Sequence, residues 1–295
     1  MENTDYTDIF QKACLIQLST SVWQGRCKLE EGVLERVGEN SDWLKGSKDL
    51  VNQDLLSPVR KIASQARNEV RKYSLPFPIK SVYLVSKEAL TSMDGKLQQY
   101  KTEFWDKVTD FELLFEMAKE EARGYLGDLY NDGDYPMDIL RKFHFEWRFL
   151  IMDVPGKSSV LPPEIYEREK EKFQSMMEET RELAISALRE EFGQIVHRLT
   201  EKLDKDSARP KVIKSSMFNR LRDFLDDFGA RNIFEDGVLV ELSQQARNLI
   251  DGVSPAGIKK NDVMRQKIKN EMNELKSSID AALEDMPRRK IRMAS

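Results

Sequence analysis

Hydrophobic residues recur at steps of three or four over two long stretches of the chain. The first begins near Ser86 and continues to Leu129, and mostly Lys, Glu, Asp and Gln fill the positions between. This pattern predicts a helix of roughly 60 Å with one apolar side. The second stretch, from about Pro163 to Asp204, repeats the pattern, and Pro163 suits a first helical turn. Two such helices predict an antiparallel helical hairpin.

Between the two long stretches, the apolar residues change to a period of two. The segment "NDGDYP" is typical of a turn, and "RKFHFEWRFLIM" follows it closely. Aromatic residues occupy alternate positions of this second segment, at Phe143, Phe145, Trp147 and Phe149. Such alternation predicts a β-strand, which needs partner strands. Segments 14–22 and 79–86 are rich in β-forming residues, so we expect a small sheet near one end of the hairpin.

The last third of the chain returns to helical spacing. A helix is expected from Ser215 or Ser216 to Phe228, ended by Gly229, and two more over about 236–251 and 261–286. The sequence therefore predicts a mainly α protein with a small β element (α+β), elongated, with a long antiparallel helical hairpin and a C-terminal helical bundle. Three consecutive segments are expected: a mixed α/β region (1–85), the hairpin (86–204) with a strand-containing insertion (131–162), and the bundle with a basic tail (205–295).

The composition favours a protein of a reducing compartment. Two cysteines, Cys14 and Cys27, provide no disulfide framework. The first residues lack the features of a signal peptide, and no apolar run approaches the roughly 20 residues of a membrane helix. The formal net charge of -4 gives no global attraction to nucleic acid or to an anionic membrane. We therefore expect a cytoplasmic protein, located in the host cytoplasm if it is phage-encoded.

The motif Gly156-Lys157-Ser158 raises the question of a nucleotide-binding loop. That loop requires a further glycine five positions before Gly156, and Ile151 stands there instead. The residues "VLPP" follow at the point where a helix would have to begin. The motif therefore predicts an exposed turn rather than a phosphate site.

The other chemistry-bearing residues form no catalytic or metal-binding motif. The two histidines, His144 and His197, lack the spacing of zinc ligands. The segment "DLYNDGD" departs from a calcium loop because Tyr130 occupies a ligand position. Gly25 is expected in a turn or bulge. We predict no catalytic residues, no cofactor and no metal, and hence a protein that is not an enzyme.

Several stretches, taken in their order along the chain, resemble one protein family. They are Trp23-x-Gly25-Arg26, Gly46-Ser47-Lys48 with Leu50-Val51, "FHFEWRF", "FLDDFGARNIFEDGVLVEL" and "ARNLIDGVSPAGI". The chain is similar to a family of bacterial and phage proteins often encoded beside MoxR-type AAA+ ATPases and proteins with a von Willebrand A-type domain. In size and build it also resembles the phage Gabija anti-defence proteins. Those proteins assemble around a host nuclease–helicase complex and block it without catalysis.

The resemblance implies a protein that works by binding other proteins. The first expectation is a phage-encoded inhibitor that assembles on a Gabija-type host defence complex and blocks its DNA binding or cleavage. The alternative is an adaptor of a MoxR-type AAA+ ATPase and its A-domain companion. The long amphipathic helices also predict a homo-oligomer with coiled-coil contacts. Direct binding of nucleic acid and of membranes is not expected.

Five residues are candidate partner contacts. Tryptophan and arginine are enriched at the hot spots of protein interfaces. The candidates are Trp43, Trp105, Trp147, Arg288 and Arg289. The alternative role for each tryptophan is packing in the core, and for the two arginines a solvated terminus.

Overall fold

The computed structural model describes residues 7–29, 46–151, 162–203, 216–253, 257–258 and 261–286. Helices dominate this part of the chain, so the expected mainly α class with a small β element is confirmed. The helices are α1 (Thr7–Lys12), α3 (Ser57–Tyr73), α4 (Lys87–Leu126), α5 (Pro163–Leu203), α6 (Ser216–Arg231), α7 (Gly237–Ile250) and α9 (Asp262–Glu284). The predicted turn at Gly156-Lys157-Ser158 lies outside the described residues.

The strands form two small sheets. The larger sheet has the strand order β4 (Leu75–Pro76), β5 (Val82–Ser86), β1 (Ala13–Ser21) and β6 (His144–Leu150). The smaller sheet pairs β2 (Arg26–Lys28) antiparallel with β3 (Ser47–Asp49), so that Cys27 lies opposite Lys48. The strands expected within 14–22, 79–86 and 143–149 are therefore confirmed, with ends displaced by a few residues.

The chain divides into two compact units that alternate along the sequence. Unit 1 contains Met1–Leu15, Tyr73–Ala89 and Leu150–Ser295, and unit 2 contains Ile16–Lys72 and Leu90–Phe149. The sequence analysis divided the chain into three consecutive segments instead. The difference arises because β1 and α4 each begin in unit 1 and continue in unit 2, a course that hydrophobic spacing within an element does not reveal.

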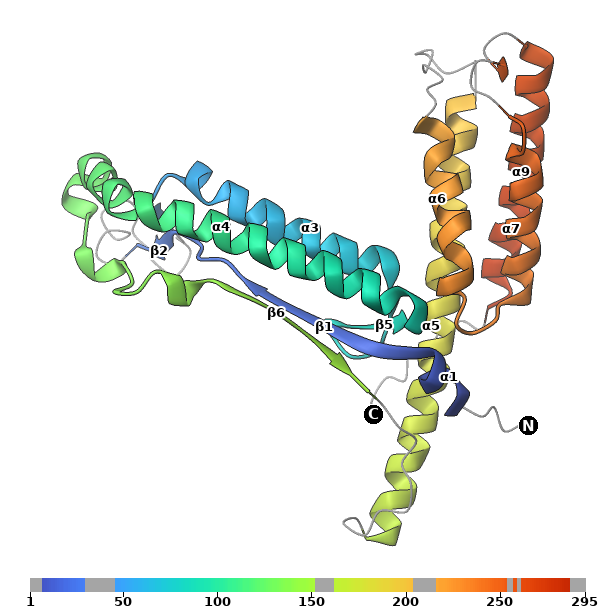
Figure 1. Cartoon of the computed structure of the whole chain (residues 1–295), viewed down its shortest axis with the longest axis horizontal. Coiled ribbons are helices and arrows are strands. Elements are labelled where there is room, and N and C mark those ends of the chain that lie inside the picture. Colours follow the sequence, from blue (N-terminus) through green and yellow to red (C-terminus); the bar gives the residue numbers. More distant parts are fainter. Residues whose placement is uncertain are drawn as a thin grey trace, which may run out of the picture. The chain divides into compact units, whose positions relative to one another are not determined.

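Unit 2 is built on the buried seam of α4. Phe104, at the middle of the seam, packs against Phe143 and Phe145, with ring centroids 6.4 and 5.4 Å apart. Figure 1 shows α3 and α4 on the same side of β1 and β6. The seam is buried as far as Ala122 and ends earlier than the spacing predicts, because Tyr125 is 84% exposed. A single helical stripe therefore forms most of the contact between α4 and the sheet.

Helix α3 is an element that the spacing analysis did not single out. Its buried side chains are small or branched and are separated by Arg, Lys and Gln: Val59, Ile62, Ala63, Ala66 and Val70. Two of these five are alanines, which contribute little to a hydropathy pattern, so a helix with this composition is easily overlooked.

Gly25 shapes the turn that follows β1. Its φ of +63° lies in the left-handed region, and a Cβ atom here would be 2.8 Å from Leu56 Cδ1 and 3.0 Å from Val51 Cγ2. Its carbonyl accepts hydrogen bonds from the backbone N–H of Leu50 and from the side-chain amide of Gln53. Both the backbone and the packing require glycine, which confirms the expected turn.

In unit 1, α5 and α9 form an antiparallel pair. Nη1 of Arg189 donates to the carbonyl of Ala282, and Nε of Arg265 donates to the carbonyl of Leu203 at 2.7 Å. From Arg189 to Leu203 on α5, the contacted residue on α9 changes from Ala282 to Arg265, so the two helices run in opposite directions. Helices α6 and α7 complete a bundle with this pair (Figure 1). The sequence analysis expected α4 beside α5, but the apolar stripe of α9 takes that place.

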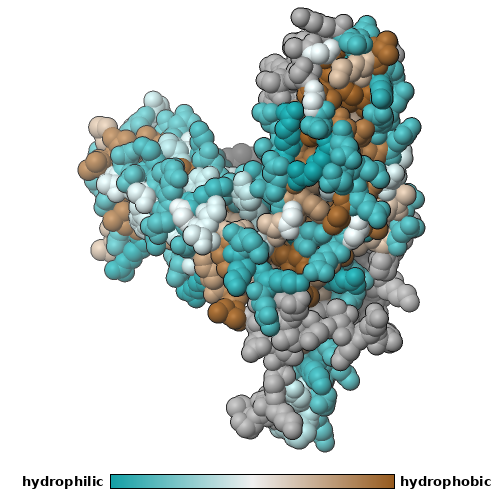
Figure 2. All heavy atoms as spheres, turned by 45° about the vertical axis from the view of Figure 1, so that its right-hand side comes forward, coloured by the Kyte–Doolittle hydropathy of each residue, from teal (hydrophilic) through white to brown (hydrophobic). Residues whose placement is uncertain are grey.

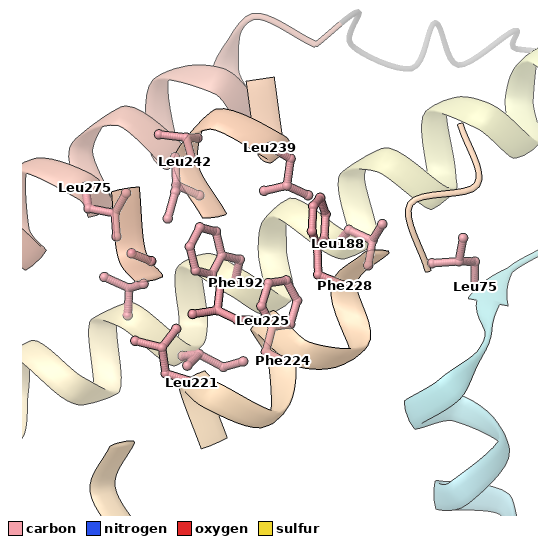
Figure 3. Packing of buried hydrophobic residues seen from close by; sticks show 14 of the residues in the cluster. Leu75, Leu188, Phe192, Leu221, Phe224, Leu225, Phe228, Leu239, Leu242 and Leu275 are labelled. Atoms are coloured by element: carbon pink, nitrogen blue, oxygen red, sulfur yellow. The ribbon is translucent and has the colours of Figure 1, made fainter. Parts of the chain in front are cut away.

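The core of unit 1 contains stacked aromatic rings. Phe192 on α5 and Phe224 on α6 have centroids 5.0 Å apart and planes 6° apart, and Phe228 lies 6.1 Å beyond Phe224. Large rings such as these bury more apolar area than any other side chains. Leucines from all four helices of the bundle surround the rings (Figure 3): Leu188, Leu221, Leu225, Leu239, Leu242 and Leu275.

Helix α6 continues to Arg231, although Gly229 was expected to end it. The guanidinium of Arg231 is buried and lies 2.6 Å from the carboxylate of Glu191 on α5. This ion pair holds the last turn of α6 against α5. A tertiary contact therefore overrides the weak helix propensity of glycine.

A second buried ion pair joins α5 to the start of α7. The guanidinium of Arg189 lies 2.7 and 2.9 Å from the two carboxylate oxygens of Asp236, and the side chains are 11% and 3% exposed. Asp236 is also the N-cap of α7, because its Oδ1 accepts a hydrogen bond from the backbone N–H of Leu239. One carboxylate thus satisfies both a helix terminus and a buried cation.

We predict that Asp236→Ala lowers the free energy of unfolding by about 3–5 kcal/mol, because it leaves Arg189 buried without an opposite charge. Denaturant unfolding followed by far-UV circular dichroism measures this change. The matched control is Glu235→Gln, whose side chain is 77% exposed in its ion pair with Lys12. Its effect should stay below about 1 kcal/mol. Equal unfolding midpoints for the two variants would contradict the role of the buried pair.

Candidate functional site

Two of the five candidate partner contacts lie within the described residues, and both are half-buried in unit 2. Nε1–H of Trp147 donates to Oδ1 of Asp94 at 2.9 Å, and the ammonium of Lys101 lies 5.6 Å from the ring centroid. Trp105 packs edge-on against Phe104 at 5.7 Å. Both tryptophans therefore have packing roles, and Trp147 connects β6 to α4.

The other three candidates, Trp43, Arg288 and Arg289, lie outside the described residues. They stay predictions from residue type alone. Trp105 and Trp147 therefore lie in one unit: Trp105 belongs to α4, and Trp147 on β6 contacts α4 through Asp94. The structure tests none of the remaining candidates.

Four large apolar side chains are exposed further along α4. Leu113, Met117 and Tyr125 are 80%, 68% and 84% exposed, and Leu114 is 39% exposed. All four positions fall outside the buried seam of the helix. We call these four residues the apolar face of α4. Figure 2 shows that the visible surface is mainly hydrophilic, with apolar residues gathered in several separate places.

Sequence reasoning missed the apolar face because it ranked residues by type and chose tryptophans. A signal was present. Leu113, Leu114 and Met117 are hydrophobic but stand between the seam positions Phe111, Phe115 and Ala118. Hydrophobic residues off the seam of an amphipathic helix indicate a second surface that something else covers.

Two grooves border the same half of α4. The first, of about 480 Å³, lies between the helix and the residues that follow β3, and Asp49, Glu121 and Tyr125 contribute to its lining. The second, of about 470 Å³, lies between the helix and residues 132–139, and includes Glu116. Tyr125 belongs to both the apolar face and the first groove, so the two form a continuous surface.

Negative charge surrounds the apolar face. Residues 110–138 include nine Asp and Glu and two cations, Lys119 and Arg123. Lys119 is paired with Glu116 at 3.3 Å, and Arg123 with Glu120 at 3.3 Å and Asp132 at 3.5 Å. Three further cations, Lys107, Lys48 and Arg141, pair with Asp110, Asp134 and Asp138. Nine carboxylates thus meet five cations, and the remaining excess of negative charge favours a basic ligand.

Two tyrosines fix the loop that follows α4. The hydroxyl of Tyr130 donates to Oδ1 of Asp132 at 2.6 Å, and the guanidinium of Arg123 lies 4.8 Å from the ring centroid. The hydroxyl of Tyr135 donates to the carbonyl of Leu50 at 2.8 Å. Burial, and then the charge of Tyr130 and the loop carboxylates, raises the pKa of Tyr135 to about 12. The loop, held by these contacts, forms one border of the second groove.

The surroundings of Cys27 make its thiol less reactive than that of a catalytic cysteine. Its thiol donates to Oδ1 of Asp134 at 3.4 Å, and Oδ2 of Asp134 lies 2.6 Å from Nζ of Lys48. Burial, followed by the hydrogen bond to Asp134, raises the pKa of Cys27. Catalytic thiols need a lowered pKa. This cluster therefore ties β2 and β3 to the loop and has a structural role.

The two histidines make contacts with neighbouring carboxylates on their own elements. Nε2 of His144 lies 3.7 Å from Glu146, and Nε2 of His197 lies 3.6 Å from Glu201. Within the described ranges, no group of three or more His, Cys, Asp and Glu is placed to hold a metal ion. In the same ranges, no helix is both long enough and apolar enough to cross a membrane.

We predict that the fold loses stability at high pH through ionisation of Tyr135. Its pKa of about 12 in the folded chain exceeds the ordinary value of 10.0, so the unfolded chain loses this proton first. The stabilisation is complete below pH 10 and is lost as the pH rises towards 12. Unfolding midpoints measured against pH should therefore fall more steeply above pH 10 for the natural chain than for Tyr135→Phe. Parallel curves would show that Tyr135 does not contribute.

Comparison with known proteins gives one family. A family model described as "Protein of unknown function (DUF3150)" matches residues 10–220, which is well over half of the chain and includes all of the described strands and α4. No curated protein and no solved structure matches the sequence. The chain therefore belongs to the DUF3150 family.

Proposed function

We propose that this protein acts by binding another protein through the apolar face of α4. The observation that carries the proposal is the exposure of Leu113, Met117 and Tyr125 on a helix surface that is otherwise charged. Exposed apolar side chains at the centre, with polar and charged groups at the rim, are typical of protein interfaces. The flanking grooves provide concave space for the partner's side chains.

The charge at the rim defines the chemistry of the partner segment. An amphipathic helix with an apolar stripe fits along α4, as in helix-in-groove recognition. Lys and Arg at the edges of that stripe would meet Glu116, Glu120 and Glu121, and their opposite charge would speed association and select the partner. We therefore infer a partner segment that is basic at its edges and apolar at its centre.

The resemblance supports two identities for the partner. We propose first a host antiviral defence complex of the Gabija type, which a phage-encoded inhibitor would block without catalysis. This identity rests on similarity in size and build. The alternative, a MoxR-type AAA+ ATPase that uses the chain as an adaptor, rests on the genomic neighbourhood of the resembling family.

Affinity purification of the tagged protein from cells with intact antiviral defence systems distinguishes these identities. A stoichiometric complex with a defence nuclease, inactive on DNA until the protein is removed, would support the inhibitor. Recovery of a AAA+ ATPase that depends on ATP would support the adaptor. Elution of the protein alone under all of these conditions would contradict the proposed function.

We predict that Leu113→Ser combined with Met117→Ser weakens partner binding at least tenfold, because central contacts at hot spots each contribute more than about 1 kcal/mol. The thermal unfolding midpoint should not change, since both side chains are exposed. The loss of binding is measured as the amount of partner retained while the concentration of the natural chain or of the double variant is increased.

The matched control for this experiment is Val263→Ser on α9, an apolar side chain that is 81% exposed. This control should retain the partner fully. Equal retention by the control and by the double variant would show that the apolar face of α4 is not the binding surface.

A further inference from the structure

The two edges of the larger sheet differ in their capacity to accept another strand. At one edge, β4 has only two residues and includes Pro76, which lacks an N–H group. Short edges with proline discourage pairing. At the other edge, β6 has seven residues without proline, and no strand of the described residues borders its outer side. β6 is therefore the open edge of the described sheet.

The sequence of β6 is symmetrical about Trp147. Phe145 and Phe149 stand two residues before and after it, and Glu146 and Arg148 stand one residue before and after it. In an antiparallel pair of identical strands centred on Trp147, Phe145 lies opposite Phe149 of the second copy. Glu146 then lies opposite Arg148 of the second copy, and Arg148 opposite its Glu146. Aromatic and opposite-charge pairs are the cross-strand pairs that stabilise antiparallel sheets.

The two faces of β6 suit this arrangement. Phe145 is 3% exposed and Trp147 and Phe149 are half-buried, so the odd positions form the packed face. Glu146 and Arg148 point to the opposite face and are 44% and 66% exposed in a contact of 3.2 Å within the strand. The hydrogen bond from Trp147 to Asp94 fixes the orientation of the central residue. The charged groups are therefore available to a neighbouring strand.

The neighbouring registers are unfavourable. When the packed faces of two copies are on the same side, odd positions face odd positions and even face even. A two-fold axis at position 146 would place Glu146 opposite Glu146, and an axis at position 148 would place Arg148 opposite Arg148. Like charges directly opposite each other destabilise a strand pair. The register centred on Trp147 pairs both charges of the strand with opposite charges.

We propose that a second copy of this chain docks edge to edge on β6, antiparallel, with the two-fold axis at Trp147. The larger sheets of the two copies then form one continuous sheet. This contact differs from the coiled-coil contacts expected from the helices, and it does not depend on the apolar face of α4. It is isologous, as expected for a symmetric dimer.

Charge reversal tests the register directly. Glu146→Arg should dimerise more weakly, because it places Arg opposite Arg twice. Arg148→Glu should also dimerise more weakly, because it places Glu opposite Glu twice. The double variant, Glu146→Arg with Arg148→Glu, should dimerise again, since each pair is reversed. An equimolar mixture of the two single variants should form a heterodimer with two opposite-charge pairs.

Sedimentation velocity over a wide range of protein concentration measures these masses, and circular dichroism checks that each variant is folded. The dissociation constant of the dimer should rise about tenfold or more in each single variant and return in the double variant and in the mixture. A natural chain that stays monomeric at every concentration would overturn the proposal. Single variants that dimerise like the natural chain, or a mixture and a double variant that stay monomeric, would also overturn it.

Discussion

A straight helix buries only one side, and this constraint organises unit 2. Over its 40 residues, α4 turns Phe104 and the rest of the seam towards the strands. The remaining positions face outward, and most of them are charged or polar. The four residues of the apolar face are exceptions, and Leu113 and Met117 among them lie well outside the buried seam. The same seam packs against Phe145 and thereby decides which side of β6 presents Glu146.

Helices α4, α5, α6, α7 and α9 were predictable, because each depends on a signal within one segment, whereas α3, with its small buried side chains, was not. The helix at α9, for example, follows from Ile268, Met272 and Leu275 at helical spacing. Which helices pair was not predictable in the same way. Both α4 and α9 offer an apolar stripe, and spacing does not say which one α5 selects. The polar contacts that fix the α5–α9 register, such as Arg189 to the carbonyl of Ala282, become visible only in three dimensions.

The candidate site was harder to predict than the fold because residue type is a weak guide to exposure. Trp147 was chosen as a tryptophan, yet its indole is satisfied by Asp94 and its ring lies beside Lys101. Leu113 and Met117 were ordinary residues whose importance comes from their position on the helix. The symmetry of "FEWRF" is visible in the sequence, but it indicates a strand-pairing surface only once the strand order places β6 at an edge of the sheet.

The two proposed surfaces are compatible within unit 2. The apolar face points away from the seam of α4, whereas strand pairing uses the free edge of β6. Within unit 2, strand pairing through β6 would therefore not involve Leu113 and Met117 of either copy. Two identical binding faces in one dimer make the second contact with a repetitive partner intramolecular, which raises avidity without any new contact. Multi-subunit assemblies, such as a defence complex or a AAA+ ring, are partners for which such a two-fold presentation has a physical advantage over a single face.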